Sequence, residues 1–139
     1  MVTFDIEAGR RAIEALDQSD FPVVAALWLY LESSEDWRLV IASPYVDRYG
    51  PGTAYSRVLE ILEEHTHPRM ALADIWLMGL KEQVVRELGK AIQTGPGLSG
   101  IRFAHSTIGD VHIVDSYIYR LNTKTTSTEA ILSKRREIA

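Results

Sequence analysis

Four histidines and the lack of cysteine limit the chemistry that this chain could perform. The 139 residues include 4 His and 0 Cys, so disulfides, thiolate metal sites, iron–sulfur clusters and a cysteine nucleophile are excluded for it. A bound metal would need imidazole and carboxylate ligands, because these are the remaining strong donors. The search for a site therefore starts from the positions of the histidines.

His105 and His112 lie on either side of a Gly-Asp dipeptide at positions 109–110. This dipeptide is typical of a two-residue β-hairpin turn, in which Ile108 would pair with Val111. Side chains alternate along strands, so this register places both imidazoles on one face of the hairpin. As diagonal neighbours, their Cα atoms would be roughly 7–8 Å apart.

A carboxylate from another element could complete a site with these two imidazoles. We expect Asp47 just beyond the carboxyl end of a strand, where α/β proteins often place functional groups, and Asp74 is the second choice. Such a set could bind a metal, or one imidazole could act as a general base. The alternative is structural, with both histidines at the margin of the core. The hypothesis depends on the register, because a shift by one residue would reverse every side chain.

A second candidate site lies at Gly50, Gly52 and Thr53, between a predicted strand and a predicted helix. Backbone N–H groups at the start of a helix are free to bind an anion. The segment lacks the Gly-Lys-Ser/Thr ending of a phosphate-binding P-loop, and the nearby Asp47 would repel an anion. The alternative is a plain turn followed by Thr53 as the helix cap.

The other face of the last predicted strand carries Asp115, Tyr117 and Tyr119, with Arg102 opposite Tyr117 in the same register. If exposed, this polar and aromatic face would suit a protein partner or a flat ligand. The alternative is that a helix covers the tyrosines and that the aspartate and arginine form an ion pair.

Hydrophobic periodicity predicts the elements that must position these residues. Apolar stripes at helical spacing predict helices at 5–20, 54–65 and 81–94, and a capping-box pattern predicts a short helix at 126–137. Apolar runs predict strands at 37–42, 73–78, 101–108 and 111–121. We expect the strand at 73–78 to be buried on both faces. The eleven apolar residues 21–31 fit either a strand or a buried helix, and we favour a strand that forms a hairpin with 37–42.

This order of elements predicts an α+β fold. We expect a mixed, mostly antiparallel sheet of about five strands, made of two hairpins and one central strand, with helices packed on it and a short C-terminal helix. The strand–helix–strand unit 37–78 would supply one parallel pair. Residues 1–122 are expected to form a single domain, and 123–139 a polar linker and a short basic helix on the same domain.

Charge and hydropathy narrow the class of partner. The chain has 15 Lys+Arg and 19 Asp+Glu, and residues 120–139 carry a net +3 that leaves −7 on the rest. Nucleic-acid contact is therefore our third-ranked hypothesis, through Lys134, Arg135 and Arg136. The longest apolar run is shorter than the ~20 residues that a membrane helix needs, and no secretory signal is recognisable, so we expect a cytoplasmic protein with no membrane contact.

The best functional interpretation is a small non-catalytic interaction or regulatory domain that self-associates through a sheet edge or the tyrosine-bearing face. Most residues are accounted for by the predicted strands and helices, and few polar residues are expected to gather at one site. The alternative is a small hydrolase or nuclease-like enzyme that uses His105 and His112 with a carboxylate and, where needed, a metal. No particular cofactor or metal is indicated.

Overall fold

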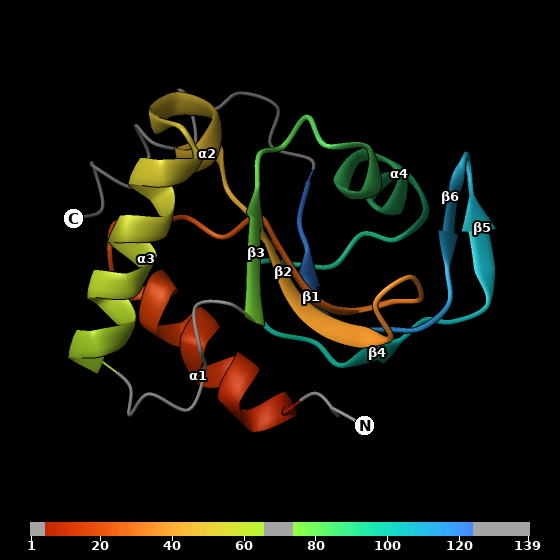
Figure 1. The fold of residues 1–139 in the computed structure, drawn as a ribbon, viewed down its shortest axis with the longest axis horizontal. Coiled ribbons are helices and arrows are strands. Elements are labelled where there is room, and N and C mark those ends of the chain that lie inside the picture. The colour runs from red at the N-terminus through yellow and green to blue at the C-terminus, as the bar shows by residue number, and fades with distance from the viewer. Residues whose placement is uncertain (1–4, 66–73, 124–139) are drawn as a thin grey trace.

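A five-stranded mixed sheet organises the chain, in a computed structural model that describes residues 5–65 and 74–123. The strands run in the order β3-β2-β1-β7-β4 (Figure 1). Their bounds are β1 Ala25–Leu31, β2 Asp36–Ala42, β3 Ile75–Met78, β4 Ile101–Arg102 and β7 Ser116–Leu121. Only the β2–β3 pair is parallel among these neighbours. The predicted α+β fold with a mostly antiparallel sheet and one parallel pair is confirmed.

The ambiguous segment 21–31 contains strand β1, which forms the predicted hairpin with β2. β1 pairs with β2 on one edge and with β7 on the other, and both of its faces are covered, because Ala26 packs in the core on one side of the sheet and Ala25 in the core on the other. A strand buried on both faces has no polar alternation, which explains why its sequence resembles that of a buried helix.

Within the part of the chain that the structure describes, four helices flank the sheet: α1 Ile6–Asp17, α2 Pro44–Tyr49, α3 Pro51–His65 and α4 Gln83–Ala91. The helices α1, α2 and α3 lie on one side of the sheet, and α4 lies on the other together with a small hairpin (Figure 1). That hairpin consists of β5 Ser106–Ile108 and β6 Val111–Ile113 and forms a separate two-stranded sheet. Asp5 caps α1, where its Oδ1 accepts a hydrogen bond from the N–H of Ala8 (2.9 Å).

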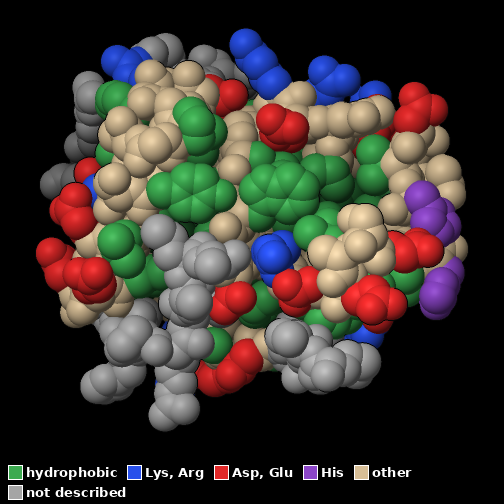
Figure 2. All heavy atoms as spheres, in the orientation of Figure 1, with side chains coloured by type: hydrophobic (Ala, Val, Ile, Leu, Met, Phe, Trp, Pro, Cys, Tyr) green, Lys and Arg blue, Asp and Glu red, His purple; other side chains and the backbone are tan. Residues whose placement is uncertain are grey.

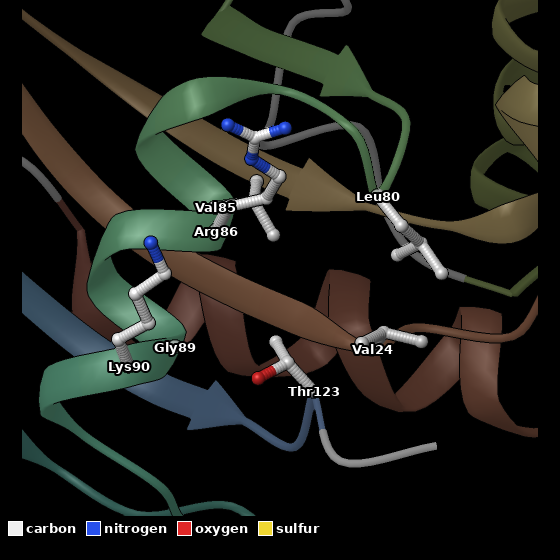
Figure 3. A pocket seen from close by; sticks show the side chains of 7 residues that line it. All are labelled: Val24, Leu80, Val85, Arg86, Gly89, Lys90 and Thr123. Carbon is white, nitrogen blue, oxygen red and sulfur yellow. The ribbon is translucent and has the colours of Figure 1, made fainter. Parts of the chain in front are cut away.

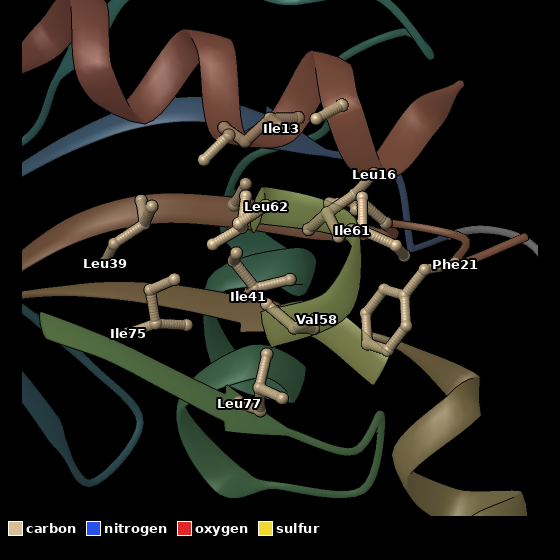
Figure 4. Packing of buried hydrophobic residues seen from close by; sticks show 14 of the residues in the cluster. Ile13, Leu16, Phe21, Leu39, Ile41, Val58, Ile61, Leu62, Ile75 and Leu77 are labelled. Atoms are coloured by element: carbon tan, nitrogen blue, oxygen red, sulfur yellow. The ribbon is translucent and has the colours of Figure 1, made fainter. Parts of the chain in front are cut away.

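Each side of the sheet has its own hydrophobic core. The first core fills the space between the sheet and the helices α1 and α3 (Figure 4). Its labelled members in that view are Ile13, Leu16, Phe21, Leu39, Ile41, Val58, Ile61, Leu62, Ile75 and Leu77. The second core joins the other face to α4 and the small hairpin through residues such as Leu27, Val85, Leu88, Ile113 and Ile118. Burial of each large aliphatic side chain stabilises the fold by roughly 1.5–3 kcal/mol.

The connection between β2 and α3 differs from the prediction. Between β2 and α3 lies the short helix α2, which the hydrophobic periodicity does not predict. Ser43 is its cap, Pro44 occupies its first turn, and Ser43 Oγ accepts from the N–H of Tyr45 (3.1 Å). α3 begins at Pro51, so Thr53 lies inside its first turn and is not the cap. Proline fits the first turn of a helix because its missing N–H has no partner there in any case.

Strand β3 lies at an edge of the sheet, whereas the sequence analysis placed the lone strand centrally. Its burial prediction was also wrong, because Trp76 is 43% exposed while Ile75 and Leu77 are buried in the first core. Met78, two residues along on the same face, is buried in the second core, so that core covers only one end of this face of β3.

The predicted helix 126–137 and the basic residues Lys134, Arg135 and Arg136 lie outside the described residues, as does the segment beyond 123 that we expected to form a linker. Within the described residues, no helix has the length and apolar character needed to span a bilayer.

Candidate functional site

The hairpin carrying His105 and His112 has the predicted register. Ile108 pairs with Val111 and Thr107 with His112, around a turn in which Gly109 has a φ of 59°. Both histidines are exposed, and histidine side chains gather at the hairpin end of the molecule (Figure 2). Thr107 Oγ1 and His112 Nδ1 are 2.9 Å apart and share a hydrogen bond.

A bend at His105 divides this hairpin in two. His105 has a φ of 51°, in the left-handed region that non-glycine residues rarely adopt, although its N–H still donates to Val114 O (3.1 Å) in the same register. Before the bend, Ile101 and Phe103 pack toward the second core, and after it Ile108 does. The face that points inward is therefore exchanged at His105.

The common face predicted for the two imidazoles stays a prediction, because the bend interrupts the alternation of side chains at His105. Uninterrupted alternation would place Phe103 and Ile118 on that face as well, and both pack in or against the second core. Both imidazoles instead lie at the exposed tip. Alternation holds only where the backbone stays extended, and a left-handed residue breaks it.

Asp47 is not brought near the two histidines. It lies on α2, whereas β5 and β6 lie at the opposite end of the long axis (Figure 1). Its Oδ2 accepts a hydrogen bond from the N–H of Leu80 (2.9 Å), which ties α2 to the segment before α4. Across residues 5–65 and 74–123, no three His, Asp or Glu side chains are grouped as metal ligands.

The carboxylate that interacts electrostatically with His105 is Asp115, which is already bound by an arginine. Arg102 Nε and Nη2 donate to the two carboxylate oxygens of Asp115 at 2.7 and 2.5 Å. These hydrogen bonds lower the pKa of Asp115 below its usual value. The Arg102 guanidinium also lies 5.9 Å from the centroid of the Trp37 ring. The pair holds the base of the hairpin, and Arg102 is the Cα partner of Tyr117, as predicted.

Tyr119 belongs to the core and is not part of a surface. Only 1% of it is exposed, and its hydroxyl accepts from Trp28 Nε1 (3.0 Å) and donates to Ile6 O (2.6 Å). Burial raises the pKa of Tyr119 to about 12. Tyr117 is half-buried and lies edge-on to Tyr119, with ring centroids 5.3 Å apart. For Tyr119, the structure therefore agrees with the alternative in which a helix covers the tyrosine.

Gly50, Gly52 and Thr53 remain together where α2 meets α3. Gly50 has a φ of 88° and separates the two helices, and Gly52 and Thr53 are exposed in the first turn of α3. The nearby Arg57 is paired with Asp20 (2.8 Å) and Glu60 (3.2 Å). An anion site here stays a prediction.

The structure also contains a pocket of about 480 Å³ that the sequence analysis missed. It lies between α4 and the segments that border β1 and β7 (Figure 3). Its lining residues are Val24, Leu80, Val85, Arg86, Gly89, Lys90 and Thr123. The i, i+4 spacing of Arg86 and Lys90 could have indicated a basic helix face, but nothing in the sequence indicates that Val24 and Thr123 lie opposite.

A second missed feature is the outer edge of β3. The hydroxyl of Tyr55, on α3, accepts from the N–H of Leu77 (3.0 Å) and donates to the C=O of Ile75 (3.4 Å). On the opposite face of the strand, Trp76 is the Cα partner of Val40, which belongs to the second core. At this edge the Tyr55 hydroxyl thus occupies the outward backbone groups, and the exposed Trp76 lies beside them.

Comparison of the chain with protein-family models, with curated proteins and with solved structures finds no match in any of the three.

Proposed function

We propose that this chain is a non-catalytic interaction domain that forms a homodimer in the cytoplasm through the face of β3 that carries Trp76. The observation that carries the proposal is the 43% exposure of Trp76 on an edge strand. Tryptophan is the residue type most enriched at the energetic centre of protein interfaces, since its large ring loses much water contact on binding. Figure 2 views this side of the molecule, where hydrophobic side chains gather around β3.

The surroundings of Trp76 favour a second copy of the chain as the partner. Arg38 lies two residues before Val40, so it points from the same face of the sheet as Trp76. Arg38 pairs with Asp36, and about a quarter of each side chain is exposed. A twofold interface presents the same patch to itself, so it needs an apolar centre with charges of both signs. This patch supplies all three.

The contact we propose uses the face of the sheet and not strand addition at its edge. Edge-to-edge pairing would need the outward N–H of Leu77 and C=O of Ile75, and Tyr55 already bonds both groups. The tyrosine-bearing face is the other surface considered from the sequence, and it offers less area because α1 covers Tyr119.

Sedimentation velocity and light scattering of the full chain, from 1 to several hundred micromolar, test this function. We expect a concentration-dependent monomer–dimer equilibrium that Trp76→Ala shifts toward monomer by roughly tenfold or more in Kd, the range of interface hot spots. Leu59→Ala is the matched control, because Leu59 is 41% exposed but lies on α3. A wild-type chain that stays monomeric throughout this range, or a Kd that both variants change equally, would overturn the proposal.

A charge exchange tests the self-complementary patch independently. Arg38→Glu should weaken the dimer through repulsion across the twofold axis. Combining it with Asp36→Arg restores one charge of each sign and should recover a measurable part of the affinity. A double variant that is no tighter than the Arg38→Glu single variant would exclude this charge pair from the interface.

A further inference from the structure

We propose that the pocket beside α4 binds a small organic carboxylate with an apolar tail. The pocket of about 480 Å³ falls within the roughly 300–1,000 Å³ of typical small-molecule sites. Its wall on one side is α4, and its other wall comes from Val24, just before β1, and Thr123, just after β7 (Figure 3). The inference is independent of the proposed dimer, because neither Trp76 nor Arg38 lines the pocket.

The charges of the pocket select an anion. Arg86 and Lys90 are its two charged lining residues, and both are exposed cations one helical turn apart. Lys and Arg side chains gather along the upper rim in Figure 2. Lys81, two residues before α4, is also exposed. Lys90 is partly compensated by Glu87, 3.2 Å away. Arg86 has no carboxylate within ion-pair distance among residues 5–65 and 74–123 and is the stronger anchor.

The floor of the pocket selects an apolar tail. Val24 and Val85 are buried members of the core, and Leu80 is half-buried at one end of the opening. An inorganic anion would contact the cations at the rim but leave this aliphatic surface unused. A carboxylate with a hydrocarbon chain satisfies both parts, since a guanidinium can bind its two oxygens in parallel and the chain can cover the valines.

Contacts between Thr123 and the residues Gly89 and Gln93 fix the wall of the pocket at Thr123. A Cβ at position 89 would collide with the Thr123 hydroxyl, so Gly89 permits the close approach of Thr123 to α4. Gln93 Nε2 donates to Thr123 Oγ1 at 2.6 Å and also to the C=O of Gly89. The wall is therefore held in place before a ligand arrives, which reduces the cost of ordering it on binding.

Titration of the full chain with octanoate, followed by calorimetry and by amide chemical shifts, tests this site. We expect saturable binding with the largest shifts in α4 and around Val24. Arg86→Gln should weaken octanoate by about tenfold or more, because it removes a charged hydrogen-bond donor. Lys81→Gln is the matched control, since Lys81 is an exposed cation shortly before α4 that does not line the pocket.

Two further probes separate the charge from the tail. Acetate carries the carboxylate alone and octan-1-ol carries the tail alone, and each should bind much more weakly than octanoate. Equal unfolding temperatures of wild type, Arg86→Gln and Lys81→Gln would show that the variants fold. Octanoate that binds Arg86→Gln as tightly as wild type, octanol that binds as well as octanoate, or no saturable binding at millimolar concentration would each overturn the inference.

Discussion

Arg120 and Asp17 are joined by two parallel hydrogen bonds that fasten β7 to the end of α1. Arg120 Nη1 donates to Asp17 Oδ1 (2.9 Å), and Nη2 donates to Oδ2 (2.8 Å). Nη1 also donates to the C=O of Val23 (3.0 Å), and only 6% of Arg120 is exposed. The buried guanidinium of Arg120 is therefore bonded to both a carboxylate and the backbone, so its loss removes several hydrogen bonds at once.

Arg120→Ala is expected to destabilise the protein by about 3 kcal/mol, the range for removing one partner of a buried ion pair. Denaturant unfolding measures this change. The control is Arg11→Ala, whose contact with Glu7 (3.5 Å) joins side chains that are about 60% exposed. Such a pair contributes less than about 1 kcal/mol. Similar losses in the two variants would show that burial does not strengthen the Arg120 contacts.

Tyr119→Phe removes the hydroxyl that bridges Trp28 Nε1 and Ile6 O. The ring still fills the core, but the Trp28 indole N–H and the Ile6 C=O lose the hydrogen bonds that this hydroxyl makes. We expect a loss of about 1–3 kcal/mol, because two hydrogen bonds of a buried hydroxyl are removed. Tyr117→Phe is the matched control, because it is the adjacent tyrosine on the same strand but is only half-buried. A smaller effect at position 119 than at 117 would contradict the bridging role.

The same tyrosine predicts a loss of stability in alkali. Burial raises the pKa of Tyr119 to about 12, above the ordinary value of 10.0. The folded state therefore keeps a proton that the unfolded state loses, so the contribution is complete below pH 10 and disappears as the pH rises through 12. Two pKa units correspond to roughly 2–3 kcal/mol. The wild-type stability curve should fall more steeply between pH 10 and 12 than that of Tyr119→Phe, and parallel curves would exclude this residue as the cause.

Tyr55→Phe is expected to uncover the outer edge of β3. The variant leaves the N–H of Leu77 and the C=O of Ile75 without the hydroxyl that bonds them. An unprotected strand edge is a template for further strands, so thioflavin-positive aggregates should form faster than in the wild type. Tyr49→Phe, at an exposed tyrosine on α2, should aggregate at the wild-type rate. Equal rates for both variants would show that the hydroxyl does not protect the edge.

Gly109→Ala tests the turn that sets the register of the last hairpin. Gly109 has a φ of 59°, and a Cβ there would also collide with the carboxylate of Glu87 on α4. We expect a loss of about 1–2 kcal/mol from the left-handed conformation alone. Asp110→Ala, at the neighbouring turn position, should change the unfolding free energy by no more than about 0.5 kcal/mol. A larger effect at Asp110 than at Gly109 would refute this account.

The sequence was most informative where local chemistry decides the structure. A Gly-Asp dipeptide between two apolar runs predicts a two-residue turn, and from that turn the pairing of Arg102 with Tyr117 follows by counting. The same counting failed for the faces, because it assumed extended backbone at His105, and nothing in a His-Ser-Thr sequence indicates a positive φ there. Register was therefore predictable, and the side chains that point inward beyond the bend were not.

The features proposed as binding sites depend on strand order, which periodicity does not encode. Trp76 is exposed because β3 is at an edge, and the pocket exists because Val24 and Thr123 border neighbouring strands. The helix α2 is hard to predict for another reason: Ser43-Pro44, the signal of a helix start, directly follows the predicted strand 37–42 and is also typical of a strand end. A cap followed by proline is equally compatible with a turn, and only the packing of α2 against α3 distinguishes the two.

The bend at His105 gives one continuous hairpin two separate tasks. Its base, β4 and β7, completes the central sheet, while its tip, β5 and β6, packs against α4. The apolar side of α4 therefore packs against both the base and the tip of the same hairpin, and opening the hairpin exposes it. Residues 83–121 should behave as one cooperative folding unit, in which slow amide exchange in α4 is lost together with that of β7.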